Sequence, residues 1–152
     1  MAKVTESQMR LKVYQKYDGH CAYCGKEIRF KDMQVDHLEP IHRIGEWKSG
    51  KYVYTGKMEK PENDTIDNMM PACRSCNYYK SSCTLQEFRD WRMKDIHKRI
   101  MKIYIAKVAI DYGIITITPF DGKFYFEKLS QLSESEMQGN ITKRGLDFRK
   151  EL

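Results

Sequence analysis

Two cysteine motifs of equal spacing constrain this chain more than any other feature of its sequence. Cys21-Ala22-Tyr23-Cys24 and Cys73-Arg74-Ser75-Cys76 each separate two thiols by two residues. Such a gap lets a tight turn direct both thiolates at one ion, and two turns complete a tetrahedral four-sulfur shell. The chain has five cysteines, an odd number, which disfavours a disulfide framework. A redox disulfide and plain burial are the alternatives, but the duplicated motif favours a structural zinc ion on Cys21, Cys24, Cys73 and Cys76.

Composition sets the class of protein in which these motifs lie. The 152 residues suffice for one ordinary domain or for a small domain with an extension. With 41% hydrophobic and 32% charged residues, the chain is too apolar for disorder throughout and too polar for a membrane. Its first residues lack the apolar stretch of a signal peptide, so we expect a soluble cytoplasmic protein. The net charge of +6 permits a polyanionic partner without requiring one.

Hydrophobic periodicity and capping residues predict an α+β chain. Helices are expected over residues 5–17, 74–81 and, as one long basic helix, 84–110, with short strands over 33–38 and 69–72.

The remaining segments are predicted from turn residues and polarity. Residues 43–67, rich in Gly, Lys and Tyr, are expected to form a long loop in which 51–54 pair briefly. Residues 114–118 and 123–126 flank Pro119-Phe120-Asp121-Gly122, which predicts a β-hairpin. These elements suggest a first domain, a basic extension and a loose tail, over residues 1–83, 84–129 and 130–152.

A set of catalytic residue types lies between and just beyond the cysteine motifs. Phosphodiester hydrolysis requires a base for water and a cation that stabilises negative charge on the phosphate and the leaving oxygen. His37 is suited to the base because the ordinary pKa of histidine lies near neutrality. Asp36 and Asn77 offer the hard oxygens that Mg²⁺ prefers. Alternation along a strand directs Asp36 and His37 differently, so one can hold the metal while the other reaches the water.

These motifs together resemble those of HNH endonucleases of the four-cysteine zinc branch. The resemblance covers about residues 12–81 and rests on four segments: Asp18-Gly19-His20-Cys21-Ala22-Tyr23-Cys24-Gly25, Val35-Asp36-His37-Leu38-Glu39-Pro40, Asp67-Asn68 and Cys73-Arg74-Ser75-Cys76-Asn77-Tyr78-Tyr79-Lys80. The sequence departs from the family pattern in having Asn77 where the family name expects histidine, and in its longer loop between His37 and Asn68. The region after Leu85 is similar to extensions of phage and prophage members, which implies the bacterial cytoplasm.

The resemblance implies a ββα-metal nuclease core with a separate structural zinc ion, followed by the long helix and the small β-hairpin. It assigns the catalytic divalent metal, Mg²⁺ or another cation such as Mn²⁺, to Asp36 and Asn77, and the general base to His37. Asn68 would hold its loop and orient the histidine, and Lys80 would contact phosphate. The implied products carry 5′-phosphate and 3′-hydroxyl ends.

The sequence thus predicts a metal-dependent endonuclease that nicks or cleaves double-stranded DNA. A non-catalytic zinc-ribbon module that binds nucleic acid is the alternative, although it gives no reason for Asp36, His37 and Asn77 to accompany the cysteines. Cleavage of RNA or branched DNA is also compatible with these residues.

Cations and aromatic rings alternate between residues 43 and 60, which suits phosphate neutralisation with base stacking or groove contact. The alternative is a solvated hairpin whose rings cover the zinc core. The basic helix over 84–110 has the same ambiguity, since its cations serve either DNA contact or solubility.

Overall fold

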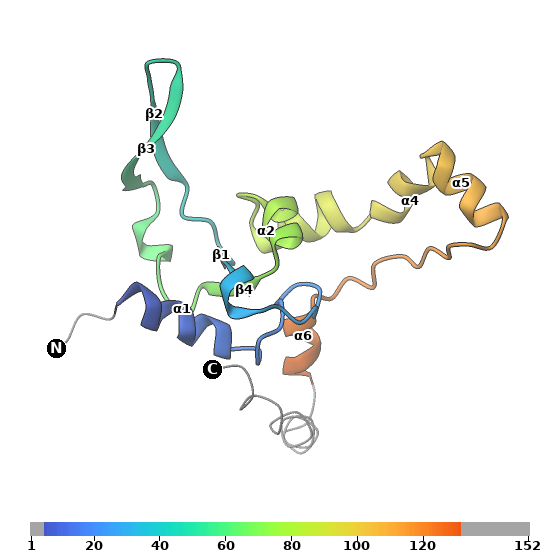
Figure 1. The fold of residues 1–152 in the computed structure, drawn as a ribbon, viewed down its shortest axis with the longest axis horizontal. Coiled ribbons are helices and arrows are strands. Elements are labelled where there is room, and N and C mark those ends of the chain that lie inside the picture. The colour runs from blue at the N-terminus through green and yellow to red at the C-terminus, as the bar shows by residue number, and fades with distance from the viewer. Residues whose placement is uncertain (1–4, 132–152) are drawn as a thin grey trace.

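The computed structural model describes residues 5–131, which form a mixed α+β fold with two small antiparallel sheets (Figure 1). In chain order the elements are α1 (Glu6–Gln15), η1 (Phe30–Asp32), β1 (Gln34–His37), β2 (Arg43–Lys48), β3 (Lys51–Met58), η2 (Pro61–Asn63), β4 (Met69–Ala72), α2 (Arg74–Lys80), α3 (Leu85–Glu87), η3 (Phe88–Met93), α4 (Ile96–Met101), α5 (Tyr104–Asp111) and α6 (Tyr125–Ser130).

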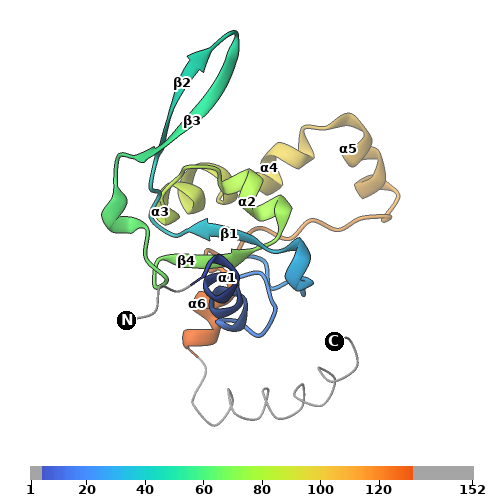
Figure 2. The same cartoon turned by 60° about the vertical axis from the view of Figure 1, so that its left-hand side comes forward.

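The centre of the fold is the antiparallel pair β1–β4, which lies between α1 and α2 (Figure 2). Its register pairs Gln34 with Ala72 and His37 with Met69. Both strands are short, and α2 begins two residues after β4 because Cys73 is the N-cap of that helix. The predicted strands over 33–38 and 69–72 and the predicted helix over 74–81 are confirmed.

The C-terminal end of helix α1 binds the chain segment that leads into β4. Thr5 and Gln8 form the predicted capping box, which confirms the helix expected over 5–17. Beyond its end, the Lys16 ammonium donates to the backbone carbonyls of Ile66 and Met69, at 2.5 and 2.8 Å. Burial lowers the pKa of Lys16. The chain entering β4, which carries Asn68, is therefore held against α1.

Residues 43–58 form a twisted β-hairpin, not the long loop that the sequence predicted. Strands β2 and β3 pair from Arg43↔Met58 to Lys48↔Lys51, with a bulge near Arg43. Ser49 and Gly50 connect them with φ of +50° and +75°, which gives the two-residue turn whose twist matches that of the strands. The many Gly and Lys residues suggested a loop, whereas the alternation of rings along the strands specifies pairing. The hairpin projects away from the strand pair β1–β4 (Figure 1).

The long helix predicted over 84–110 is wrong as one element. It begins as predicted, at the Thr84–Glu87 capping box, and continues through the π-helical turn η3. Asp95 then leaves helical geometry, and Ile103 adopts an extended conformation between α4 and α5. The predicted apolar stripe has no continuous surface to pack against, because only the first part of this segment reaches the core at Phe88.

The predicted hairpin over 114–126 is also wrong. Residues 114–124 form no strand, and α6 begins at Tyr125 because the Glu127 carboxylate accepts from the Phe124 backbone N–H at 2.8 Å. Arg89 holds Glu127 through two hydrogen bonds of 2.7 and 3.0 Å, and this ion pair lowers the pKa of Glu127. The aromatic rings of this segment pack into the core. An isolated hairpin would not bury these rings and would be only marginally stable.

The core joins the start of α6 to the first cysteine motif. The Phe88 and Phe124 rings stack at 5.0 Å, and the Tyr23 ring meets each of them edge-on at 5.6 Å. The Tyr125 and Phe126 backbone N–H groups donate to the carbonyls of Tyr23 and Ala22. The aromatic cluster therefore fixes the Tyr23 side chain in place, which matters for the site below.

In the part of the chain that the structure describes, no helix is long and apolar enough to cross a membrane. The tail predicted over 130–152 lies almost wholly outside the described residues.

Candidate metal centre and active site

The four cysteines predicted as metal ligands come together. The Cys21, Cys24, Cys73 and Cys76 sulfurs all lie within 4.8 Å of one another, and the Cys24 and Cys73 sulfurs are 3.9 Å apart. Four sulfurs at about 2.3 Å from a zinc ion in tetrahedral geometry lie about 3.8 Å apart. The cluster therefore has the dimensions of a site for one metal ion, and the clustering predicted from the spacing is confirmed.

Local backbone structure aims these thiols. In the first motif the Gly25 N–H donates to the Cys21 carbonyl at 2.9 Å, and Gly25 has φ of +74°. A side chain at Gly25 would also collide with the Tyr125 ring of α6. In the second motif Cys73 caps α2 and Cys76 lies in its first turn. An ion held by all four sulfurs would thus fix the start of α2.

Crowding of the thiols changes their protonation. The pKa of Cys24 is lowered to about 3, mainly because the Cys21 and Cys76 thiols hydrogen-bond to it. The pKa of Cys76 is raised because of its hydrogen bonds with Cys21 and Cys24 and its partial burial. Four thiolates at these distances repel one another unless a cation lies between them. This chemistry fits a metal centre better than packing of thiols as small apolar groups.

Asp36 is a buried carboxylate on β1 with one oxygen already bound. Its Oδ2 accepts a hydrogen bond from the Tyr23 hydroxyl and forms an ion pair with the Lys80 ammonium at 3.1 Å. Burial first, and then the charge of Asp36, raise the pKa of Tyr23, so Tyr23 stays protonated and donates. Within residues 5–131 no group hydrogen-bonds to Oδ1. One oxygen of Asp36 is thus fixed, and the other has no partner in the described part of the chain.

Lys80 is fully buried at the end of α2. Its ammonium donates a hydrogen bond to the His37 carbonyl at 2.7 Å and forms the ion pair with Asp36. The resemblance implied that Lys80 contacts phosphate, whereas its ammonium here contacts β1. Lys80 therefore compensates the buried charge of Asp36 and ties α2 to the strand.

His37 forms a hydrogen bond with a residue that the sequence did not point to. Its Nε2 lies 2.8 Å from Oδ1 of Asp64, whose side chain is 39% exposed. An ionised carboxylate can only accept, so in the neutral imidazole Nε2 carries the hydrogen and Nδ1 holds the free lone pair. Asp64 lies in a polar turn between Glu62 and Thr65 and carries no signal that separates it from any solvated loop carboxylate.

Asn68 acts on this loop and does not contact His37 directly. Its side-chain amide donates to the carbonyls of Glu39 and Asn63, at 2.7 and 2.8 Å, and accepts from the Glu39 N–H at 2.9 Å. It therefore ties the chain that leaves β1 to the turn that precedes Asp64. Asn68 can therefore influence the orientation of His37 through the backbone of residues 38–39 and through the turn that carries Asp64.

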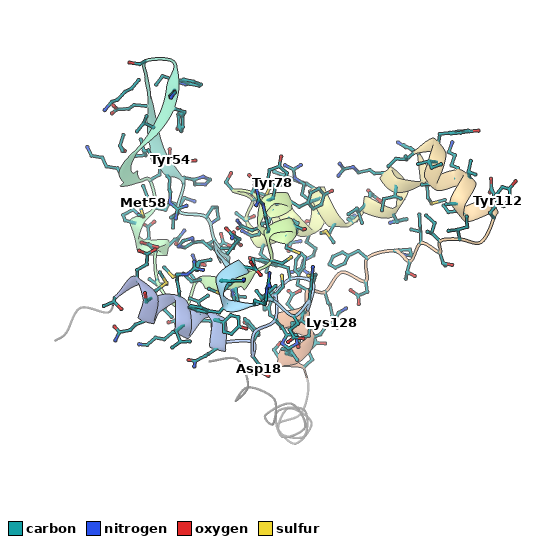
Figure 3. The ribbon with its side chains drawn as sticks, viewed as in Figure 1. Asp18, Tyr54, Met58, Tyr78, Tyr112 and Lys128 are labelled. Atoms are coloured by element: carbon teal, nitrogen blue, oxygen red, sulfur yellow. The ribbon has the colours of Figure 1, made fainter. Side chains whose placement is uncertain are left out.

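A cavity of about 930 Å³ brings three of the predicted residues together: Asp36, His37 and Asn77 all line it. Its other walls include the cations Arg43 and Arg92, along with His42 and the ring of Tyr54. Figure 3 labels two residues of its rim, Tyr54 on β3 and Tyr78 on α2. A carboxylate, an imidazole and an amide thus share a cavity that has two arginines on its wall and is large enough for a phosphodiester.

The donor set of this cavity fits a divalent cation. The free Oδ1 of Asp36 and the side chain of Asn77, which forms no hydrogen bond within residues 5–131, supply oxygens of the type that Mg²⁺ and Mn²⁺ bind. Two protein ligands leave coordination positions for water and phosphate.

Comparisons with known proteins add one structural similarity. No protein-family model matches the chain, and no curated protein matches it. The crystal structure of the Type II-C Cas9 enzyme from Actinomyces naeslundii is similar to 66% of this chain, with 20% sequence identity and a TM-score of 0.40. The chain spans about a tenth of that enzyme's length, since the match covers 10% of the Cas9 chain.

Proposed function

We propose that the protein is a metal-dependent HNH-type endonuclease that hydrolyses phosphodiester bonds of double-stranded DNA. The observation that carries this proposal is the convergence of Asp36, His37 and Asn77 on one cavity beside a four-cysteine cluster. The free Nδ1 of His37 supplies the base, and two unpartnered oxygen donors supply the metal site. A module that only binds nucleic acid requires neither the base nor the oxygen donors.

In this proposal His37 takes a proton from water at Nδ1 while Asp64 holds its Nε2–H. Asp36 and Asn77 hold the divalent cation, with Tyr23 and Lys80 fixing the carboxylate. When bound, the cation would stabilise negative charge on the phosphate and on the leaving 3′ oxygen. Arg43 and Arg92 on the cavity wall would attract the DNA backbone. The products would carry 5′-phosphate and 3′-hydroxyl ends.

In the same proposal the four cysteines hold a structural zinc ion. A closed four-sulfur shell has no open position for water or substrate, so the zinc ion would shape the site without entering the chemistry. The ligands indicate which metal the site prefers, because a tetrahedral set of thiolates selects zinc over hard cations such as Mg²⁺.

Nicking of supercoiled plasmid tests the proposal against a zinc-ribbon module that only binds nucleic acid. We expect relaxed and then linear DNA when Mg²⁺ or Mn²⁺ is added, and no conversion when the added metal is omitted. The new ends should be substrates for DNA ligase, which requires a 5′-phosphate and a 3′-hydroxyl. Tight DNA binding without nicking in either metal would support the binding module instead.

Asp64→Asn is expected to lower kcat by about 100-fold, with little change in KM for DNA, because the amide can also donate and no longer fixes the histidine tautomer. Asp67→Asn is the matched control, since Asp67 is an exposed carboxylate of the same loop whose side chain makes no hydrogen bond within residues 5–131. Nitrogen NMR of the His37 ring reports the tautomer without cleavage. Equal kcat and an unchanged tautomer in Asp64→Asn would contradict this positioning role.

A further inference from the structure

One face of the β2–β3 hairpin carries a row of exposed aromatic rings. Trp47 pairs with Tyr52, and Gly45 pairs with Tyr54, so the alternation of strands puts these side chains on the same face. The rings of Trp47, Tyr52 and Tyr54 are 75%, 50% and 64% exposed. The alternative in which such rings cover the zinc core is not what the structure shows. They lie on a projecting arm of the molecule (Figure 1).

The row is ordered by contacts within the hairpin. Tyr52 meets Trp47 and Tyr54 edge-on, each at 5.6 Å between ring centres. The Tyr52 ring lies directly over Gly45, where a Cβ atom would come within 2.4 Å of it. Only glycine therefore permits this ring position. The three rings form a preorganised surface, so little conformational entropy is lost when a ligand covers them.

The same hairpin is strongly basic. Between residues 43 and 58 it carries Arg43, Lys48, Lys51 and Lys57 against Glu46 alone. Glu46 contacts Lys48 at 3.3 Å, and the other three cations form no ion pair within residues 5–131. Exposed rings beside unpaired cations are complementary to nucleic acid, whose bases stack on rings while its phosphates are neutralised.

The residue types favour unpaired bases over a base-paired groove. Asn and Gln, which read adenine edges, are absent from residues 43–58, and the single arginine, Arg43, lies at the base of the hairpin, where it lines the cavity. Tyr and Trp offer flat surfaces instead, and a base exposes its face only when it leaves the double-helical stack. The hairpin is thus built for stacking.

The row begins at the candidate active site. Tyr54 and Arg43 line the same cavity as Asp36 and His37, and Trp47 lies near the far tip of the hairpin, beside the Ser49-Gly50 turn. A strand bound along the row would therefore pass from the cavity towards the tip.

We infer that Trp47, Tyr52 and Tyr54 bind unpaired bases of a strand adjacent to the phosphodiester in the cavity. The substrate class is then a duplex that carries a single-stranded segment, such as a flap or an opened region. This inference rests on the proposed nuclease function for its cleavage part, whereas base stacking on the hairpin can be measured without cleavage.

Tryptophan fluorescence tests the inference directly. The chain has two tryptophans, so a Trp91→Phe, His37→Ala protein reports Trp47 alone and does not cut DNA by the proposed mechanism. We expect single-stranded oligodeoxythymidine to quench this fluorescence and to bind more tightly than a blunt duplex of the same length. Oligouridine in a parallel titration distinguishes RNA from DNA as the source of the unpaired bases.

Ring removal tests the residues. Tyr52→Ala and Tyr54→Ala should each weaken single-strand binding about 10-fold, whereas Tyr52→Phe should retain it because the ring remains. Tyr112→Ala is the matched control, because Tyr112 is 81% exposed at the end of α5, far from the hairpin (Figure 3). Equal affinity for the blunt duplex, or no loss in both alanine variants, would overturn the inference. Stacking without any nicking by wild-type protein would refute the nuclease proposal and leave the binding surface supported.

Discussion

Replacing His37 with alanine is expected to lower the rate of plasmid nicking by about 10²- to 10⁴-fold, the range that general-base catalysis contributes. The Nδ1 lone pair is the proposed acceptor for the proton of the attacking water, and alanine offers no substitute. The buried contacts of Asp36 with Tyr23 and Lys80 do not involve the His37 side chain. We therefore expect the variant to fold, to bind DNA and to keep its full content of metal on the cysteines.

Two further variants make this result specific. His37→Gln keeps a polar side chain of similar length and should be as inactive as alanine, which separates loss of the base from loss of packing. His42→Ala removes the other imidazole that lines the cavity and should cost less than 10-fold, since His42 has no carboxylate partner within residues 5–131. Nicking at the wild-type rate by a nuclease-free preparation of His37→Ala would exclude His37 as the base.

Local sequence signals predicted the parts of this fold that local contacts decide. The capping boxes at Thr5 and Thr84 were visible because cap and partner lie three residues apart. Each Cys-x-x-Cys turn is also a local structure, whereas the meeting of the two turns, with Cys24 and Cys73 49 residues apart, was predicted from the four ligands that a structural zinc ion takes. The strand with Asp36 and His37 followed from its alternation.

Long-range packing explains the elements that the sequence did not predict. Residues 114–126 have the composition of a hairpin, but Phe124 stacks on Phe88, and Arg89 holds Glu127 at the start of α6. Those partners lie more than thirty positions away along the chain. Tertiary contacts thus overrode the local preference for strands.

In the candidate site, too, residues with a local sequence signal were predicted, and residues whose role depends on distant contacts were not. Asp36, His37 and Asn77 were predicted from residue types that carry chemistry. Asp64 was missed because a loop carboxylate gains its role only from the 27-residue separation that the fold closes. The burial of Lys80 was equally hidden, since a lysine at a helix end is normally solvated.

Loss of one cysteine ligand is expected to have the largest effect on stability. Cys73→Ser should abolish stoichiometric zinc and cooperative unfolding together, because a structural zinc ion contributes about 10–16 kcal/mol of apparent binding free energy to folding. This is comparable to the whole stability of an ordinary domain, about 5–15 kcal/mol. Cys73 also occupies the N-cap position of α2, so loss of the ion would release the start of the helix that carries Asn77 and Lys80.

Cys83→Ser is the matched control for this substitution, since Cys83 is half-buried and stands outside the cluster. We expect one zinc per chain by elemental analysis and an unchanged Tm in this variant. Cys73→Ser should lose zinc, the near-ultraviolet circular dichroism of the Tyr23–Phe88–Phe124 cluster and nicking, whereas His37→Ala should lose nicking alone. A Cys73→Ser protein that keeps both stoichiometric zinc and the wild-type Tm would show that the four sulfurs do not form a structural metal centre. The contrast between the two variants separates the ion that shapes the site from the side chain that acts in it.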